Sequence, residues 1–297
     1  MSAQPTVRPV TVPDELADDP RLLVGEHDAP LALCRLPVAD LHIDREGEPG
    51  PSVGTQLMRG ERARVLGEGP AGWLRVAGEH DRYVGWVRRV ALDIGTERRP
   101  LPEHTHAVSV PRSFLYPAPD LAERPAVATL PLGARVLVRR TLEVRNTPYA
   151  VLDDGRSVVM RHLAQRGTHA RDPVAVAEML LHTPYLWGGR TALGLDCSGL
   201  VQLCHGLCGR RVLRDADMQE RSVGAAVDTE FDGDGVPTAE LRRGDLVFWR
   251  GHCGMMQDAE RIIHASGHSM TVTSERLAQA VQRIRRLYAD PTSVRRV

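Results

Sequence analysis

The chain has 297 residues, which is enough for two or three domains of about 100–150 residues each. Lys plus Arg and Asp plus Glu both number 38, so the formal net charge is zero and neither nucleic acid nor an anionic membrane is indicated as a partner. No secretory signal opens the chain, no apolar run of about 18 residues could span a membrane, and five cysteines do not suggest a disulfide framework. We therefore expect a cytoplasmic protein with reduced thiols.

The N-terminal part divides into an arm and two β-type runs. Residues 1–33 are rich in Pro and Asp and have weak periodicity, so we expect an extended arm with a short helix near residues 19–24. Residues 34–99 contain "RARVLGE", "GWLRVAG" and "RYVGWVRR", which alternate apolar and polar residues between Gly-containing turns. This pattern predicts a small, strongly bent β-barrel. Residues 100–168 repeat its outline, which suggests a diverged tandem repeat.

Residues 169–297 show a mixed pattern. A helix is expected from Pro173, with Asp172 as its N-cap, and a second helix in "LDCSGLVQLCHGLCG", ended by Gly209. Three strands are expected in "RRGDLVFWR", "GHCGMMQ" and "RIIHAS", and "TSERLAQAVQRIRRLY" predicts a late helix, alone or followed by a strand. Helices followed by an antiparallel sheet define an α+β fold.

The segment "GLDCSGLVQLCHGLCG" contains three of the five cysteines. Cys197 falls at the start of the predicted helix, where Asp196 and Ser198 can cap backbone N–H groups and the helix dipole lowers the pKa of a thiol. Cys204 and Cys208 fit a packed helix face. We expect no metal site, since no CxxC pair is present and His205 points about 100° away from Cys204 on the helix.

A cysteine nucleophile requires a general base, and His252 and His264 fall in two strands of one predicted hairpin. A three- or five-residue loop centred on Asp258 would place them directly opposite each other, and other odd loop lengths would place them diagonally on one face. An even loop would separate them, and they would then be unrelated strand residues. On one face, one imidazole could take the thiol proton while the second orients it.

Three blocks of sequence resemble the NlpC family of papain-like cysteine peptidases, which cleave peptidoglycan peptides. They are "TPYLWGGRTALGLDCSGLVQ", "RRGDLVFWRG" and "HCGMMQDAERIIHAS", and the similarity covers residues 170–285. The resemblance implies that Cys197 is the nucleophile, His252 the base and later the acid, and His264 the orienting residue. It also implies that Tyr185 lies near the oxyanion site and that no cofactor is needed.

The upstream run "VGTQLMRGERARVL…GWLRV…RYVGWV" resembles bacterial SH3-like domains. The whole chain is therefore similar to a subgroup with two SH3-like β-barrels before a papain-like peptidase domain. That subgroup contains γ-D-glutamyl-L-diamino acid endopeptidases, so the resemblance implies a murein tri- or tetrapeptide substrate with a free N-terminal L-Ala, and we expect a monomer. It further implies that four residues read the amino end of the substrate: Tyr83, Asp196, Ser198 and Asp215.

Two positions depart from the family pattern. Some members carry an acid just before "TQL", whereas Gly54 precedes Thr55 here, and Cys253 replaces an aliphatic residue. We expect Cys253 to point into the core, because it follows His252 in a strand.

Two carboxylates, Asp196 and Asp215, near a thiolate would raise its pKa unless a cation balances them. The ammonium group of the substrate could supply that cation.

Two alternatives to this endopeptidase remain. The same Cys–His–His set could catalyse a different acyl transfer, such as hydrolysis of the N-acetylmuramoyl-L-alanine amide or transpeptidation. In another class, the chain could be a wall-peptide-binding protein whose peptidase domain is inert. The complete set of three candidate catalytic residues argues against inertness.

Overall fold

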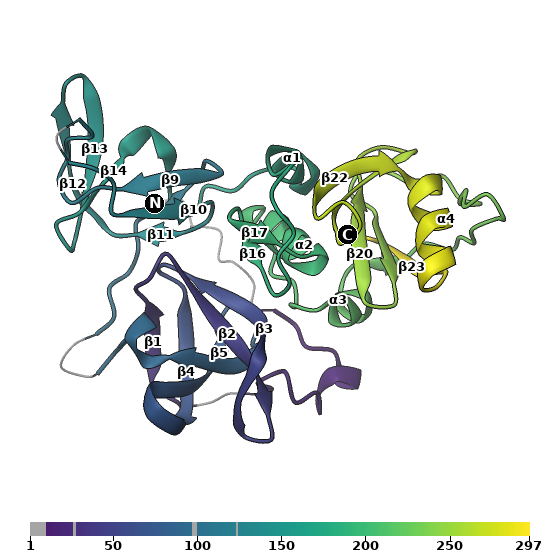
Figure 1. The fold of residues 1–297 in the computed structure, drawn as a ribbon, viewed down its shortest axis with the longest axis horizontal. Helices are drawn as coiled ribbons and strands as arrows, with labels where there is room; N and C mark the ends of the chain where they lie inside the picture. Colours follow the sequence, from purple (N-terminus) through teal and green to yellow (C-terminus); the bar gives the residue numbers. More distant parts are fainter. Residues whose placement is uncertain (1–9, 26–27, 97–99, 123) are drawn as a thin grey trace, which may run out of the picture. The chain divides into compact units, whose positions relative to one another are not determined.

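The computed structural model describes residues 10–25, 28–96, 100–122 and 124–297. The chain folds into two compact units, the first formed mainly by residues 20–168 and the second mainly by residues 169–190 and 194–297 (Figure 1). Among the described residues, no helix has the length and apolar character needed to cross a membrane. The finer division of the first unit into two domains at residue 99 remains a prediction.

The first unit opens with a seven-stranded antiparallel sheet of order β3-β2-β6-β5-β4-β1-β7. Its strands are β1 (Leu31–Cys34), β2 (Val38–Arg45), β3 (Glu48–Met58), β4 (Arg62–Glu68), β5 (Trp73–Gly78), β6 (Val84–Arg88) and β7 (Leu92–Ile94). Register shifts in the β2–β3 and β4–β5 pairs bend the sheet around a core of small and branched apolar residues, including Ala32, Leu41, Leu57 and Val76.

The short helix expected near residues 19–24 is wrong. A 3₁₀ turn (Asp14–Leu16) lies further upstream, and residues after Pro20 run extended beside β6. Val84 donates its N–H to Arg21 O at 2.8 Å, and Leu23 donates to Arg82 O at 2.9 Å. The β-type pairing of Leu22 with Tyr83 explains the difference, because it holds this segment in an extended conformation.

The second run of the first unit forms three small antiparallel sheets of orders β10-β9, β11-β8-β15 and β12-β13-β14. The strands are β8 (His106–Val108), β9 (Arg112–Leu115), β10 (Ala128–Pro131), β11 (Arg135–Val136), β12 (Val138–Val144), β13 (Thr147–Leu152), β14 (Ser157–Val159) and β15 (Leu163–Gln165). Both runs end in a 3₁₀ turn, Arg89–Ala91 or Met160–His162, followed by a three-residue strand. This shared ending supports the expected tandem repeat.

The second unit is α+β, as predicted. Its helices are α1 (Pro173–Met179), α2 (Cys197–Leu207), α3 (Ala216–Ser222) and α4 (Leu277–Leu287). Its six-stranded sheet has the order β18-β23-β19-β20-β21-β22, with strands β18 (Ala225–Ala226), β19 (Leu246–Trp249), β20 (His252–Met256), β21 (Arg261–Ser266), β22 (Thr271–Arg276) and β23 (Pro291–Arg296). A separate two-stranded ribbon, β16 (Arg190–Thr191) and β17 (Gly194–Leu195), precedes α2.

Helix α4 covers the sheet of the second unit (yellow in Figure 1) and packs Leu277, Val281 and Ile284 into its core. Helix α2 lies against β20 and β21. The late helix was predicted correctly with a strand after it, but its first four residues, 273–276, belong to β22 instead. This matters for the site, because β22 runs beside the strand that holds His264.

Candidate active site

Cys197 is the first residue of α2, and Asp196 is the N-cap of that helix, as predicted. The Gly199 N–H donates to Asp196 Oδ1 at 2.7 Å. A Cβ on Gly199 would lie 2.2 Å from Gly189 O, so the first turn of α2 can approach this backbone because position 199 lacks a side chain. Cys197 is therefore held at a helix N-terminus whose position is fixed by close packing.

Arg214 lies beneath this N-terminus and is 1% exposed. It forms a two-pronged ion pair with Asp196, with Nη1 at 3.0 Å from Oδ1 and Nη2 at 2.7 Å from Oδ2. The Gly188 N–H also donates to Asp196 Oδ2, at 2.9 Å. The protein therefore supplies a cation of its own for Asp196, and the balancing role of the substrate ammonium stays a prediction. A substrate ammonium would have to share this carboxylate with Arg214.

Ser198 and Asp215 border the same ion pair. Ser198 Oγ accepts from Arg214 Nη1 at 2.8 Å and donates to Asp196 Oδ1 at 3.3 Å, so it supports the N-cap rather than acting as one. Asp215 is the N-cap residue of α3, yet its side chain makes no capping hydrogen bond to the described first turn. The roles of Ser198 and Asp215 in substrate binding stay predictions.

The two predicted histidines meet on one face of the sheet. His252 Nε2 lies 2.8 Å from His264 Nδ1. The register pairs Met256 with Ile262, so His252 is diagonal to His264, and the directly opposite arrangement is wrong. Asp258 begins the loop instead of standing at its centre, because its carboxylate accepts from the N–H groups of Glu260 and Arg261.

The diagonal contact between His252 and His264 depends on Gly254, which lies opposite His264 on β20. A Cβ on Gly254 would lie 3.0 Å from His264 Cβ and 2.7 Å from Ile262 Cδ1. The missing side chain at Gly254 lets the His264 side chain lie over β20. His264 is 1% exposed and burial lowers its pKa, while the hydrogen bond to Glu275 opposes that shift.

The Cys197 thiol is 7% exposed, and its pKa is held well below the usual value. Its hydrogen bond with Cys253 and the charge and hydrogen bond of His252 lower the pKa, against a burial effect that raises it. Cys253 is fully buried, as expected for a core residue, but its thiol also lies beside Cys197 and donates to Gln219 Oε1 at 3.7 Å. A thiol of low pKa beside an imidazole can act as a nucleophile.

Tyr185 is half-buried, and its amide N–H donates to Met270 O at 2.9 Å. Burial and the nearby charges of Cys197 and Asp196 raise the pKa of its phenol. The hydroxyl therefore stays protonated and can donate a hydrogen bond near the thiol, as an oxyanion donor must.

Cys204 and Cys208 lie at the far end of α2. Cys204 is fully buried and burial raises its pKa, while Cys208 is the half-buried C-cap residue of the helix. This agrees with the packing role expected for Cys204, and neither thiol has the environment of Cys197.

Tyr83 belongs to the first unit and is buried. A Cβ on Gly54 would lie 2.9 Å from the Tyr83 hydroxyl, so the ring occupies the space that a side chain at position 54 would need. This accounts for the absence of an acid directly before Thr55. The role of Tyr83 in substrate binding stays a prediction.

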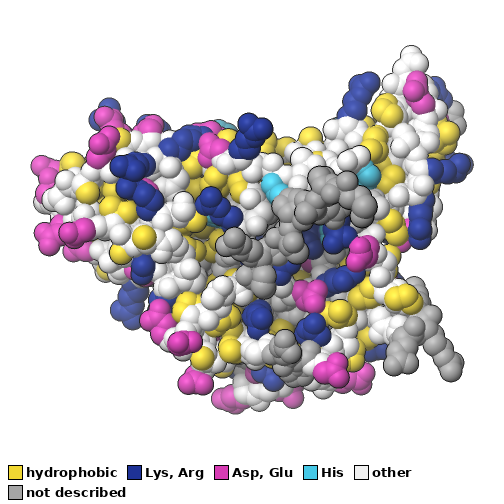
Figure 2. Space-filling view, turned by 180° about the vertical axis from the view of Figure 1, so that it is seen from behind, with side chains coloured by type: hydrophobic (Ala, Val, Ile, Leu, Met, Phe, Trp, Pro, Cys, Tyr) yellow, Lys and Arg dark blue, Asp and Glu magenta, His cyan; other side chains and the backbone are white. Residues whose placement is uncertain are grey.

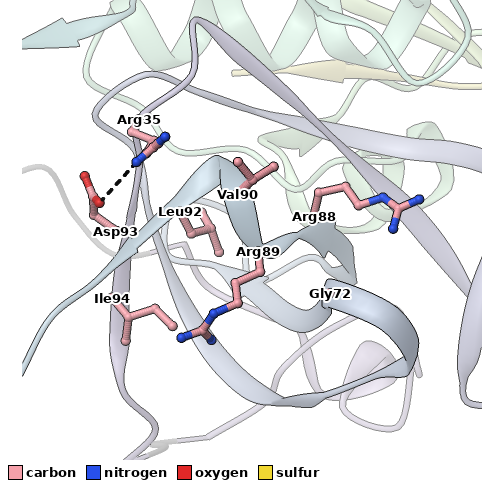
Figure 3. Close-up of a pocket in the computed structure, with 8 residues that line it drawn as sticks. All are labelled: Arg35, Gly72, Arg88, Arg89, Val90, Leu92, Asp93 and Ile94. Carbon is pink, nitrogen blue, oxygen red and sulfur yellow. Dashed lines mark ion pairs between the residues drawn. The ribbon is translucent and has the colours of Figure 1, made fainter.

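A hollow of about 630 Å³ in the first unit contains none of the predicted site residues (Figure 3). It is lined by Arg35, Gly72, Arg88, Arg89, Val90, Leu92, Asp93 and Ile94. The Arg88 guanidinium stacks on the Trp73 ring at 4.1 Å, and Arg35 pairs with Asp93 at 4.0 Å. Arg88 and Arg35 of this hollow therefore already interact with other side chains of the first unit.

Sequence reasoning missed four polar residues around the site. Gln219 donates from Nε2 to Ser198 O at 2.9 Å, and Arg214 holds Asp196 as described. Glu275 Oε1 lies 2.8 Å from His264 Nε2, and Arg283 donates to both oxygens of Glu275 at 2.6 Å. Glu275 could have been found by extending the strand pattern of "RIIHAS" into "TVTSER" and pairing the two strands.

Comparisons with known proteins agree with this architecture. A family model described as the NlpC/P60 family matches residues 182–287, and one described as the bacterial dipeptidyl-peptidase Sh3 domain matches residues 45–92. The chain is 26% identical over 261 residues to the gamma-D-glutamyl-L-lysine dipeptidyl-peptidase of Bacillus subtilis (strain 168), which covers 80% of this chain and 82% of the relative. It is 25% identical over 240 residues to dipeptidyl-peptidase 6 of Lysinibacillus sphaericus, with 74% and 83% covered.

A crystal structure of an NlpC/P60 family protein from Bacillus cereus ATCC 10987 has a TM-score of 0.67 to this chain at 19% identity. It covers 90% of this chain and 99% of that chain, which shows that the fold is shared. The fold and the matched models define a papain-like domain preceded by an SH3-like β domain. Residues 182–287 form an NlpC/P60 domain, and the protein is a cysteine peptidase.

Proposed function

We propose that the protein hydrolyses the γ-D-glutamyl–L-diamino acid bond of murein tri- or tetrapeptides that have a free N-terminal L-Ala. The low-pKa thiol of Cys197 beside the 2.8 Å His252–His264 pair carries this proposal. The two relatives named as dipeptidyl-peptidases, similar over most of the chain, support the bond and the substrate class.

In the proposed reaction, His252 takes the proton of the Cys197 thiol, and the thiolate attacks the carbonyl carbon of the γ-glutamyl amide. The oxyanion accepts hydrogen bonds from the Cys197 N–H at the α2 N-terminus and from Tyr185. His252 then gives its proton to the leaving amino group of the diamino acid. Water, deprotonated by His252, attacks the thioester, and L-Ala-D-Glu leaves as Cys197 regains its proton.

We further propose that Ser198 and Asp215 read the free amino group of the substrate and that Asp196 shares its charge between this group and Arg214. Tyr83 is included on the family resemblance alone. An acetylated N-terminus removes the positive charge, so it removes what Asp196 and Asp215 attract.

The test is incubation with L-Ala-γ-D-Glu-diaminopimelate, followed by mass spectrometry. We expect the wild type to release L-Ala-D-Glu and the Cys197→Ala variant to release none. The N-acetylated peptide should be turned over at least roughly ten-fold more slowly, since one lost charge-assisted contact corresponds to more than about 1.4 kcal/mol.

Two outcomes would contradict the proposal. Hydrolysis of a muramyl-linked peptide next to L-Ala, without cleavage of the free tripeptide, would indicate an amidase. Binding of the tripeptide by wild type with no product from any of these peptides would indicate a wall-peptide-binding protein.

A further inference from the structure

A line of four polar side chains runs away from the proposed base. It crosses the neighbouring strands β20, β21 and β22 through His252, His264 and Glu275, and it ends at Arg283 on α4. The contacts are His252 Nε2 to His264 Nδ1 at 2.8 Å, His264 Nε2 to Glu275 Oε1 at 2.8 Å, and Arg283 to both Glu275 oxygens at 2.6 Å. Each residue of the line thus touches the next.

The hydrogen bonds along this line determine which ring nitrogen of each histidine carries a proton. Burial of Glu275 is outweighed by its hydrogen bonds from His264 and Arg283, which lower its pKa to about 2, so it is an ionised carboxylate and can only accept. His264 Nε2 must therefore carry a proton. Since His264 is neutral in its buried position, its Nδ1 is an acceptor.

The tautomer of His264 in turn determines the tautomer of His252, the proposed base. His264 Nδ1 accepts, so His252 Nε2 must be the donor in the 2.8 Å contact. A neutral His252 then has its free lone pair on Nδ1, the nitrogen left to face Cys197. One carboxylate, two contacts away, selects the tautomer of His252 that can accept the thiol proton.

We propose that Glu275 is a positioning residue of the peptidase, which, held by Arg283, keeps His264 and through it His252 in the tautomers that leave His252 Nδ1 free as the base. This inference rests on the proposed role of His252, and its tests include one that needs no substrate. After proton transfer, the same line also stabilises the His252 imidazolium, because its Nε2–H still donates to a neutral His264.

A purely structural role is the competing explanation, since Glu275 and Arg283 also tie β22 to α4. The two explanations differ for two variants. Glu275 Oε1 accepts from both His264 Nε2 and Arg283 Nη2, and Oε2 accepts from Arg283 Nη1. Glu275→Leu removes the acceptor at His264 Nε2, so the His264 proton can move to Nδ1, and His252 then carries its proton on Nδ1, where it blocks the base. Glu275→Gln combined with Arg283→Met removes the ion pair but keeps an oxygen that can accept from His264 Nε2.

The first experiment measures the peptidase kinetics of Glu275→Leu. We expect kcat to fall roughly 10- to 100-fold, part of the 10²–10⁴ that general-base catalysis contributes, with KM changed less than roughly three-fold. Glu178→Leu is the matched control, because Glu178 makes the same two-pronged pair with Arg243, at 3.0 Å for each prong, away from any histidine of the site. It should keep the wild-type kcat.

The second experiment is a rescue. Glu275→Gln combined with Arg283→Met breaks the ion pair between β22 and α4, but its amide oxygen can accept from His264 Nε2 and keep the original tautomers. The double variant should therefore be more active than Glu275→Leu. A structural role predicts that both variants are impaired alike, because both lack the ion pair.

The third experiment reads the tautomers directly by ¹H–¹⁵N NMR of protein labelled in its histidine rings, with His264 assigned from a His264→Asn variant. We expect the proton of His264 on Nε2 in the wild type and on Nδ1 in Glu275→Leu. Wild-type tautomers together with wild-type kcat in folded Glu275→Leu would overturn the proposal, as would a double variant no more active than Glu275→Leu. Failure of the wild type to cleave any peptide would instead refute the proposed function and leave the NMR result interpretable.

Discussion

At the scale of single residues, the thiol of Cys197 has two neighbours that favour its charged form. His252 supplies a positive charge and Cys253 a hydrogen bond. A thiol is a weak donor, and the single S–H of Cys253 can also point to Gln219 Oε1 at 3.7 Å. We therefore expect the imidazolium to matter more than the second thiol.

Replacing Cys253 with Ala should raise the pKa of Cys197 by about one unit, whereas His252→Ala should raise it by roughly two or more, because an opposite charge shifts a pKa more than a weak donor does. The measurement is the pH dependence of iodoacetamide alkylation at Cys197, followed on its own peptide because Cys208 is also partly exposed. Cys204→Ala is the control, since Cys204 is buried further along α2. An unchanged alkylation profile in Cys253→Ala would show that its thiol does not act on Cys197.

The residues that carry the proposed chemistry were predictable because they sit in motifs. Cys197 follows a helix-capping pattern, and the two histidines fall in recognisable strands. Arg214 was not predictable in the same way. A buried arginine looks like a surface arginine in a sequence, and its burial depends on which carboxylate the fold brings to it.

At the scale of elements, the N-terminus of α2 depends on a buried ion pair. Asp196 caps the helix and is paired with Arg214, and both are almost inaccessible to solvent. Removing one partner leaves an uncompensated buried charge, which is a larger loss than the pair itself contributes. The position of Cys197 is therefore sensitive to a residue in the loop after α2.

Replacing Arg214 with Met should lower the free energy of unfolding by about 3 kcal/mol, the range measured when one partner of a buried pair is removed. Arg243→Met is the control, because Arg243 is 41% exposed in its pairs with Asp172 and Glu178 and should lose less than about 1 kcal/mol. Urea denaturation of each variant measures the change in the free energy of unfolding. Asp196→Asn combined with Arg214→Met should recover part of the loss, and a double variant as unstable as the sum of both would contradict this account.

The elements of the second unit show where sequence patterns stop being informative. The starts of α1 and α2 and the existence of β19–β21 were predicted, because caps and alternation are local signals. The register of β20 and β21 was not, since it depends on how the Asp258 side chain closes the loop. Likewise, residues 273–276 have helical propensity, but pairing with β21 makes them a strand.

At the scale of the molecule, the balanced charge of the sequence appears as interspersed positive and negative side chains on the face shown in Figure 2. The order of β-type runs followed by an α+β part was predictable from hydrophobic period alone. The pairing order of seven strands in the first sheet was not, because sheet order depends on contacts between residues distant in sequence. The sequence also does not show which histidines are buried.

His205 and His104, one in each unit, lose proton affinity on folding. Burial lowers the pKa of His205 to about 4, with no hydrogen-bond partner for either ring nitrogen among the described residues. Burial and nearby arginines lower the pKa of His104, also to about 4. Both start from 6.5, so between pH 6.5 and 4 the unfolded chain binds more protons than the folded one. Stability is therefore fully present above pH 6.5 and is lost as the pH falls toward 4.

Replacing His205 with Leu should remove its share of this acid sensitivity. At pH 5 that share is roughly 2 kcal/mol, from about 1.4 units at 1.36 kcal/mol each, and near pH 8 it is close to zero. Urea denaturation at pH 8 and pH 5, followed by tryptophan fluorescence, gives the loss on acidification for each protein. The loss should be smaller in His205→Leu than in the wild type. Equal losses in wild type and His205→Leu would mean that His205 is protonated as easily in the folded protein as in the unfolded chain.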